Sequence, residues 1–155
     1  MNLTPDQQAA LQSFQNFLTN PSAPHVFILK GSAGTGKTTL IRLFHEFASS
    51  HQFQSLFMTP TGRAAQILSQ KCDVHATTIH RRIYKLDDSP EQPFIHFIIR
   101  PLVVPPAAIL FVDEASMVGD STIRADPTLW EFDFGSQRLL SDLLEYSLIP
   151  SVPNK

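Results

Sequence analysis

The N-terminal part of the chain carries apolar residues at helical spacing. Leu11, Phe14 and Phe17 recur every three or four positions, so they share one side of an amphipathic helix. Thr4 is a typical N-cap residue, and the proline after it suits the first position of a helix. The pattern therefore predicts a helix over residues 5–19.

Short apolar runs then alternate with further helical patterns. The runs that predict strands are residues 25–29, 55–59, 94–99 and 107–112. The segments that predict helices are residues 37–49, 63–70, 77–84 and 136–148. Five prolines between positions 90 and 106 predict irregular chain around the third run. Because strands alternate with helices, we expect an α/β fold with a three-layer parallel sheet.

Two details of these patterns make sharper predictions. In helix 63–70, Ala64, Ile67 and Leu68 share one face, which is expected to be buried. The runs at 25–29 and 107–112 lack polar residues in alternation, and this is typical of strands that are covered on both faces.

Composition limits the classes of protein that fit. A chain of 155 residues with 43% hydrophobic composition can bury one ordinary core, so we expect a single domain with an irregular Pro-rich segment at about 88–106. The net charge of −2 gives no overall attraction to nucleic acid. Cys72 is the only cysteine, which excludes an internal disulfide. Neither a secretory signal nor a membrane-spanning run is recognisable, so a cytoplasmic protein with no membrane contact, or a nuclear one in a eukaryote, is expected.

The run GSAGTGKTT indicates phosphate chemistry. It satisfies G-x-x-x-x-G-K-[ST] between a predicted strand and a predicted helix. Glycines let backbone N–H groups turn toward phosphate oxygens, and the new helix adds its positive end. Lys37 would neutralise the β- and γ-phosphates, and the Thr38 hydroxyl would bind Mg²⁺. The residues expected at the nucleotide are Gly31, Ser32, Ala33, Gly34, Thr35, Gly36, Lys37, Thr38 and Thr39. A plain glycine-rich turn with an exposed lysine is the alternative.

Two acidic residues follow the predicted strand 107–112. Ligands bind at the carboxyl edge of a parallel sheet, so both carboxylates are expected to face the nucleotide. Asp113 is the expected partner of Mg²⁺. Glu114 is placed to activate the water that attacks the γ-phosphate, so Glu114 and Lys37 are the candidate catalytic residues. The alternative is structural, because two acids can cap a helix that starts at Ala115.

Five stretches together resemble superfamily 1 DNA helicases of the RecD-like branch. In chain order they are LTPDQQAAL, GSAGTGKTT, TPTGRAAQIL, ATTIHRRIY and FVDEASMV, and the resemblance covers residues 3 to about 148. The phosphate loop alone indicates only an NTPase, whereas TPTGRAA and TIHR make the resemblance specific. It implies a RecA-like P-loop NTPase domain, with ATP and Mg²⁺ as ligands and single-stranded DNA as a partner.

The same resemblance assigns roles to further residues. Gln7 would contact the adenine of ATP; its alternative is a capping partner for Thr4, and one side chain cannot easily do both. The residues similar to nucleic-acid contacts are Thr59, Thr61, Gly62, Arg63 and, in a second stretch, His80. Between positions 63 and 85, five Lys and Arg against one Asp form a local basic patch that suits phosphates. A solvated helix face is the alternative.

The resemblance also predicts parts that the sequence does not match. A strand with a Gly-Asp and Gln motif should follow the last helix, and a second motor domain should supply an arginine to the ATP site; no later residue fits either. Hydrolysis by this chain alone should be slow, because a missing trans arginine typically costs about 10³- to 10⁵-fold in rate. Activity would then need a second motor domain or a partner chain. A non-catalytic module that binds nucleotide and DNA, and a small P-loop kinase, stay open as alternatives.

Overall fold

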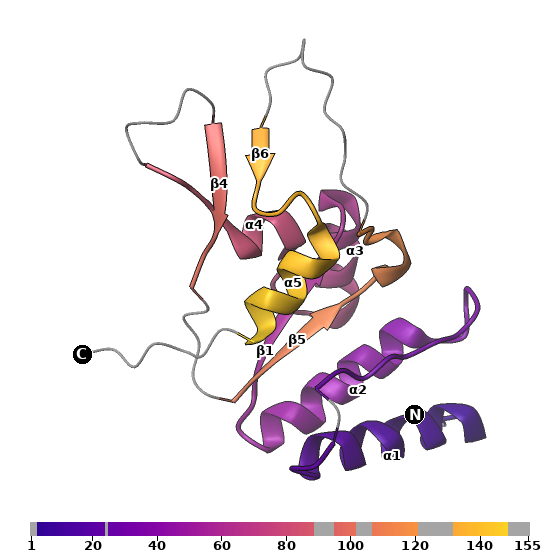
Figure 1. Ribbon diagram of the computed structural model, residues 1–155. Coiled ribbons are helices and arrows are strands. Elements are labelled where there is room, and N and C mark those ends of the chain that lie inside the picture. The colour runs from indigo at the N-terminus through magenta and orange to yellow at the C-terminus, as the bar shows by residue number, and fades with distance from the viewer. Residues whose placement is uncertain (1–2, 24, 89–94, 102–106, 121–131, 149–155) are drawn as a thin grey trace.

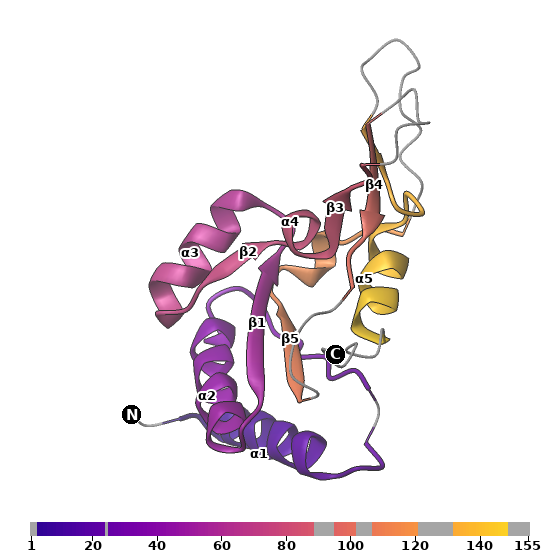
Figure 2. The same ribbon diagram turned by 90° about the vertical axis from the view of Figure 1, so that its left-hand side faces the viewer.

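Helices and two small sheets make up the chain (Figure 1). The computed structural model describes residues 3–23, 25–88, 95–101, 107–120 and 132–148. One sheet has the strand order β2-β1-β5 and the other has the order β3-β4-β6. Helices lie on both sides of the first sheet, which is the α/β arrangement that the sequence predicted (Figure 2).

Parallel pairing holds the first sheet together. β1 (Gln54–Thr59) pairs on one side with β2 (Ala76–Thr78) and on the other with β5 (Ala108–Val112). β1 and β5 confirm the predicted strands at 55–59 and 107–112 to within one residue. β2 falls partly in the segment for which the sequence predicted a helix.

The three strands of this sheet end at one edge. Thr59 lies opposite Thr78, and Met58 lies opposite Val112. The acidic pair that begins at Asp113 therefore follows β5 at the same edge at which β1 and β2 end.

Two helices begin as the sequence predicted. α1 (Pro5–Thr19) has a complete capping box, in which the Gln7 amide donates to Thr4 Oγ1 and the Thr4 amide donates to Gln7 Oε1. α2 (Lys37–Ser50) follows the glycine-rich loop and buries Phe44 on its inner side. The periodic apolar positions are therefore a correct guide to both helices.

Aromatic rings join α1 and α2 to the sheet. Phe14 is 2% exposed, and its ring stacks on Phe44 with 4.2 Å between centroids. Phe27 meets both rings edge-on, and Phe57 stacks on Phe111 at 4.9 Å. These rings are part of a cluster, here called the first core, whose buried members are Phe14, Leu40, Ile41, Phe44, Phe57, Ala65, Leu68, Cys72, Ala76 and Phe111.

Residues 25–30 do not form the predicted strand. They have no regular secondary structure and belong to neither sheet. Phe27 and Leu29 pack against the first core, whereas Val26 and Ile28 are 54% and 70% exposed. The side chains alternate as in a strand, yet a strand also needs a neighbour with which to exchange hydrogen bonds. No described segment is paired with residues 25–30, so the predicted strand and its burial on both faces are wrong here.

α3 (Gly62–Cys72) confirms the predicted helix and corrects its buried face. Ala65, Leu68 and Cys72 are buried, whereas Ile67 is 42% exposed. Two sets of apolar positions share Leu68 and both have helical spacing. The neighbouring α2 and β1 decide between them, and the sequence of α3 does not contain that information.

The second sheet departs from the expected parallel arrangement. β3 (Tyr84–Leu86) pairs antiparallel with β4 (Ile95–Ile99), and β4 pairs parallel with β6 (Phe132–Phe134). β4 confirms the predicted strand from residue 95 onward, and position 94 lies outside the described residues. Only residues 87–94 separate β3 from β4, which is too short for the crossover that a parallel pair needs, so an antiparallel pair is expected.

Two short helices and a longer one complete the chain. α4 (Ile79–Ile83) is shorter than the predicted helix 77–84, because its flanks pair as β2 and β3. η1 (Ala115–Met117) is a single 3₁₀ turn. α5 (Leu139–Leu148) confirms the predicted closing helix from residue 139 onward. Within the described ranges, no helix has the length and apolar character that a membrane crossing needs.

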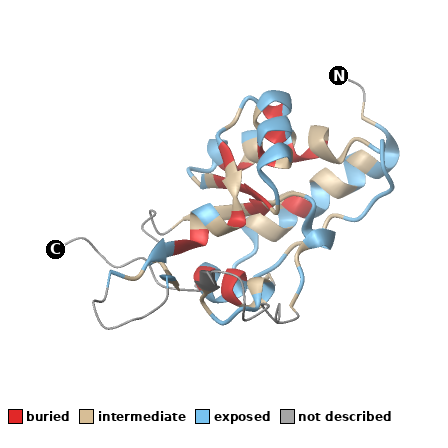
Figure 3. Cartoon of the chain, turned by 90° about the horizontal axis from the view of Figure 1, so that it is seen from above, coloured by how far each residue is buried: buried red, intermediate tan, exposed pale blue. Residues whose placement is uncertain are grey.

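A second core lies on the opposite face of β1. Phe57 points into the first core, and its neighbours Leu56 and Met58 point the other way, as alternate residues of a strand must. The buried members of this second core are Leu56, Met58, Ile79, Ile83, Tyr84, Leu143 and Tyr146. Figure 3 shows buried residues concentrated in the interior, with exposed residues on the outward sides of the helices. The first sheet therefore separates two apolar layers.

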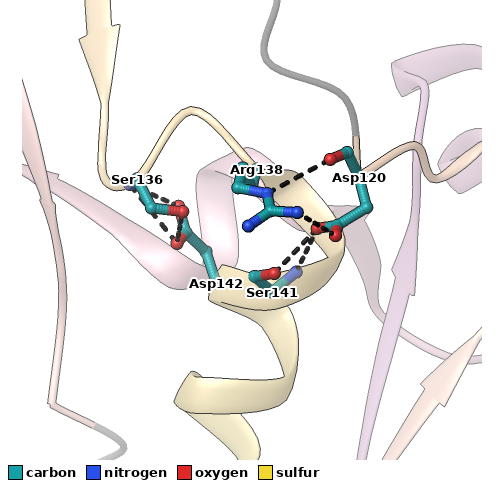
Figure 4. A network of polar contacts seen from close by, with 5 residues as sticks. All are labelled: Asp120, Ser136, Arg138, Ser141 and Asp142. Carbon is teal, nitrogen blue, oxygen red and sulfur yellow. Dashed lines mark hydrogen bonds and ion pairs between the residues drawn. The ribbon is translucent and has the colours of Figure 1, made fainter.

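Asp120 and Arg138 hold the start of α5 (Figure 4). Asp120 Oδ1 accepts from the Ser141 hydroxyl at 2.7 Å and the Ser141 amide at 3.2 Å, and Arg138 Nη2 lies 3.1 Å from Asp120 Oδ2. The Ser141 hydroxyl, followed by the Ser141 amide and Arg138, lowers the pKa of Asp120. The Arg138 side chain is therefore bonded to Asp120 at the start of α5.

Asp142 is the buried carboxylate of the same region. It is 1% exposed and accepts from the Tyr84 hydroxyl at 2.6 Å and from the Ser136 amide at 3.0 Å. Buried charge is tolerated only where donors surround it. These donors tie α5 to β3 across the second core.

Candidate nucleotide site

The glycine-rich loop lies near the edge at which β1 and β5 end. α2 starts at Lys37 and leads, after a short turn, into the beginning of β1, so the helix runs back along the sheet (Figure 2). Its first turn is then close to the ends of the strands. Residues 31–35 are exposed, and residues 36–39 are half-buried. The loop is an open surface rather than an enclosed pocket.

Lys37 is folded onto the loop that precedes it. Its Nζ donates to the Gly31 carbonyl at 2.8 Å and to the Ser32 carbonyl at 2.9 Å. The Thr35 hydroxyl donates to the same Ser32 carbonyl at 2.9 Å. Residue Lys37 is half-buried, and its ammonium group bonds to the loop, so the lysine is not freely exposed as the alternative expects. Its role at the phosphates stays a prediction.

At two glycines, an added Cβ would meet a neighbouring side chain. A Cβ on Gly31 would lie 2.8 Å from Thr35 Oγ1, and a Cβ on Gly36 would lie 2.6 Å from Gln7 Nε2. Gly36 also has a φ of +84°, in the left-handed region that favours glycine. Backbone without a Cβ allows a phosphate group to approach closely.

Gln7 contacts the loop while it caps α1. Its Nε2 donates to the Thr35 carbonyl at 3.0 Å, and its Oε1 accepts from the Thr4 amide at 3.0 Å. The structure shows the capping that was the alternative for Gln7, and the same side chain also reaches the loop. The contact with adenine stays a prediction.

Asp113 and Glu114 follow β5 in a tight turn. The Asp113 amide donates to the Met58 carbonyl at 3.0 Å and continues the sheet pairing, and Asp113 Oδ1 accepts from the Glu114 amide at 3.0 Å. Glu114 is exposed, has a φ of 54° and makes no side-chain cap for η1. The capping alternative is thus unsupported for Glu114, whose role in catalysis stays a prediction.

Cys72 of α3 lies next to the start of α2, and no motif in the sequence indicated this position. Its Sγ donates to the Thr38 carbonyl at 3.5 Å. Burial raises the pKa of the Cys72 thiol, and the nearby Asp113 carboxylate raises it further. Thr38 and Asp113, the two expected magnesium ligands, therefore both lie close to this thiol although they come from different elements.

The first stretch of expected nucleic-acid contacts forms the turn between β1 and α3. Thr59 is fully buried, and its hydroxyl donates to the Thr61 carbonyl at 2.8 Å. Thr61 Oγ1 accepts from the Ala64 amide at 3.2 Å and caps α3. Gly62 and Arg63 are exposed. The two threonines shape the turn, and the two residues after them face solvent.

The second stretch places His80 on α4. Its ring lies edge-on against Phe134 at 5.3 Å and close to Tyr84 at 5.7 Å. Burial lowers the pKa of His80. The ring is half-buried, and its contact with DNA stays a prediction.

The predicted basic patch is spread over several elements. Its exposed members are Arg63, Lys71, Arg81 and Lys85, which lie at both ends of α3, on α4 and on β3. Arg82 is half-buried and lines a surface hollow of about 300 Å³ together with Asp73. The charges thus do not form a single helix face.

The α/β sheet and the loop between residues 30 and 37 define a RecA-like P-loop domain. The chain belongs to the AAA domain family, whose model matches residues 2–125.

Two curated proteins are similar in sequence to this chain. The chain is 36% identical over 94 residues to the ATP-dependent RecD2 DNA helicase of Deinococcus radiodurans, and the match covers 61% of this chain and 12% of that protein. It is 31% identical over 127 residues to an uncharacterized protein of Methanocaldococcus jannaschii, with coverage of 76% and 11%. The matched region spans about an eighth of the length of these relatives. The resemblance to a RecD-like superfamily 1 helicase motor domain is confirmed.

Proposed function

We propose that this chain binds ATP with Mg²⁺ as the N-terminal motor domain of a DNA helicase. In the complete protein, hydrolysis of that ATP drives movement along single-stranded DNA. The observation that carries the proposal is Lys37, whose Nζ is held by the Gly31 and Ser32 carbonyls inside an exposed loop. A cation in this place is ready to exchange backbone oxygens for phosphate oxygens.

The loop and its surroundings fit a magnesium nucleotide. Gly31, Gly34 and Gly36 give the loop the conformational freedom to turn its backbone N–H groups toward phosphates, and Gly34 and Gly36 have positive φ values. Thr38 and Asp113 offer the hydroxyl and carboxylate oxygens that Mg²⁺ takes in NTPases, where phosphate oxygens and water complete its shell. When bound, the ion would neutralise charge on the β- and γ-phosphates.

Asp113 and Glu114 are proposed to have different roles. Glu114 is exposed and makes no cap to η1, so its carboxylate is available to accept a proton from the attacking water. Asp113 is half-buried, and its Oδ1 is restrained by the hydrogen bond from the Glu114 amide. A restrained carboxylate suits an ion ligand, and an unrestrained one suits a base that moves with the water.

Single-stranded DNA is proposed to contact the start of α3. Gly62 and Arg63 are exposed there, and Thr59 and Thr61 shape the turn that presents them. A guanidinium and a helix N-terminus both attract phosphate. Affinity for single strands should then fall steeply as salt is raised, because counterions are released on binding.

The first test is a calorimetric titration with MgATP. Wild-type chain is expected to bind, and Lys37→Ala to bind about ten- to hundredfold more weakly, because hydrogen bonds to charged groups contribute about 1.5–3 kcal/mol. Lys30→Ala removes the same charge from the exposed residue just before the loop and is the matched control. Equal affinity of the Lys37→Ala variant and the wild-type chain would remove the basis of the proposal.

Turnover separates the proposed motor from the non-catalytic alternative. ATP hydrolysis is measured with and without single-stranded DNA, first on this chain and then on the complete protein. DNA-stimulated hydrolysis that is lost in Glu114→Gln supports the motor. Binding of ATP and DNA by the complete protein without any hydrolysis supports a non-catalytic module instead.

A further inference from the structure

Gln7 joins two elements that are distant in sequence. The residue lies in the first turn of α1, and its Nε2 reaches the Thr35 carbonyl at 3.0 Å. The next residue, Gly36, approaches so closely that a Cβ there would lie 2.6 Å from the same nitrogen. The side-chain amide of Gln7 is therefore packed against the last turn of the loop, immediately before Lys37.

The hydrogen-bonding capacity of this amide is only half used. A carboxamide has two N–H donors and an oxygen with two lone pairs. Among the described contacts, one donor goes to Thr35 and one lone pair accepts the Thr4 amide. One donor and one lone pair are left for another partner, so contact with the loop does not compete with contact with a base.

The hydrogen bond between Gln7 and Thr35 restrains the part of the loop that has the most conformational freedom. Gly34 and Gly36 have φ values of +79° and +84°, and glycine gains the most freedom when such a turn is released. Thr35 lies between them, and the Gln7 bond restrains its carbonyl from outside the loop. The backbone amide of Thr4 holds the Gln7 side chain in turn, since it donates to Gln7 Oε1.

We propose that Gln7 is a positioning residue for the phosphate loop, and that it raises affinity for phosphate whether or not a base is present. This inference rests on the proposed binding of MgATP. It differs from a role in adenine recognition, which would affect only ligands that carry the base. The two roles can be separated with a ligand that lacks adenine.

Magnesium tripolyphosphate is that ligand, and calorimetry gives its affinity for each variant. Gln7→Met keeps the length of the side chain but removes its donor and its acceptor. The substitution is expected to weaken the binding of tripolyphosphate and of MgATP alike by about three- to tenfold, the usual effect of one hydrogen bond. Gln12→Met makes the same chemical change at an exposed position of α1 and is expected to leave both affinities unchanged.

Thr4→Ala separates the loop contact from the helix cap. It removes the hydroxyl that caps α1 but keeps the backbone amide that bonds to Gln7. The variant is expected to lose stability to urea while its affinity for tripolyphosphate stays within about twofold of wild type, since one cap contributes about 1 kcal/mol.

Three outcomes would overturn the inference. Gln7→Met could weaken MgATP but not tripolyphosphate, which would leave Gln7 with the base alone. Thr4→Ala could reproduce the full loss, which would assign the effect to the cap. Wild-type chain could bind neither ligand, and then the proposed function itself fails.

Discussion

Gly36 is restrained twice, by its own backbone and by a neighbour. Its φ of +84° lies in a region that other residues enter only at a cost, and the amide of Gln7 fills the space where a side chain would start. The tip of Gln7 could move aside, but it would then release Thr35. Any substitution here strains the backbone or frees the loop.

Gly36→Ala is therefore expected to lower the free energy of unfolding by at least about 1 kcal/mol and to weaken MgATP. Urea unfolding and calorimetry measure the two effects. Gly62→Ala is the control for stability, because nothing lies within 4 Å of the added Cβ and the residue starts a helix. That variant should be neutral or slightly more stable; equal losses in both variants would contradict the argument.

Tyr84 shows how burial affects a single ionisable group. Burial raises the pKa of Tyr84 far above its ordinary value of 10.0, and the bond to Asp142 raises it further. Burial also raises the pKa of Tyr146. These are the two tyrosines of the chain, and both belong to the second core.

The sign of the resulting pH dependence follows from proton binding. Above about pH 10, the unfolded chain loses tyrosine protons that the folded chain retains, so the free energy of unfolding should fall as pH rises. Urea unfolding between pH 8 and alkaline pH, with tyrosinate absorbance as a second probe, measures this fall. Tyr84→Phe should make the slope shallower. Free ionisation of both tyrosines near pH 10 in folded protein would show that the rings are accessible.

At the scale of elements, α5 is held by carboxylates at its start and by apolar side chains along its length. The Tyr84 hydroxyl joins this helix to β3 through Asp142. Tyr84→Phe at neutral pH should cost about 1–3 kcal/mol, because it leaves a buried carboxylate with one donor fewer. Thermal and urea unfolding check this, and Tyr146→Phe serves as a comparison. A loss no larger than that in Tyr146→Phe would mean that the Asp142 bond contributes little.

Elements whose signals are local could be predicted closely from the sequence. α1 has its cap, its proline and its apolar period within one stretch, and the predicted bounds match. The chain at 25–30 carries a strand pattern, yet the sequence cannot show whether a neighbour pairs with it. β2 and β6 are three residues each and exist through pairing with distant strands, so no pattern marks them.

The same distinction applies to the candidate site. The loop from Gly31 to Thr38 is contiguous and could be predicted as one motif. The Gln7 contact with Thr35 and the position of Cys72 beside Thr38 arise from packing of separate helices. The family resemblance likewise predicted Thr59 as a nucleic-acid contact. The sequence could not show that the Thr59 hydroxyl donates to the Thr61 carbonyl within the same turn.

At the scale of the whole molecule, the first sheet separates two cores, and α1 is attached to one of them by Phe14. The Phe14 ring contacts Phe17, Phe27, Phe44 and Phe111. This attachment also sets the distance between Gln7 and the loop. The candidate nucleotide site thus depends on an aromatic cluster that lies outside the glycine-rich loop.

Phe14→Ala should lower the free energy of unfolding by about 3–5 kcal/mol, which is a large part of the 5–15 kcal/mol of an ordinary domain. In the folded fraction it should also weaken MgATP, because α1 is held less firmly. Phe14→Leu should cost less in both measurements. If Phe14→Ala lost stability without any loss of affinity in the folded fraction, the link between α1 and the loop would be refuted.

The outer edge of β5 has a consequence for handling the protein at high concentration. The Asp113 amide donates to the Met58 carbonyl, and the Gln54 amide donates to the carbonyl of residue 107. The backbone N–H and C=O groups of odd-numbered residues along β5 therefore point toward β1. Backbone groups of the even-numbered positions, 108, 110 and 112, then point away from β1. In the described part of the chain, β5 has no strand on that side. Such an edge is a template for aggregation.

Val26 and Ile28 are further exposed apolar side chains, in residues 25–30. Solubility should respond to a charge placed there, because exposed apolar groups also favour association. Ile28→Lys, at a position that is 70% exposed, should raise the concentration at which light scattering begins and change stability by less than about 0.5 kcal/mol. Ile67→Lys adds the same charge on α3, where the side chain is 42% exposed, and should have a smaller effect. Equal effects would mean that net charge alone governs precipitation, whereas a larger effect at Ile28 would make this stretch the place where colloidal stability is lost.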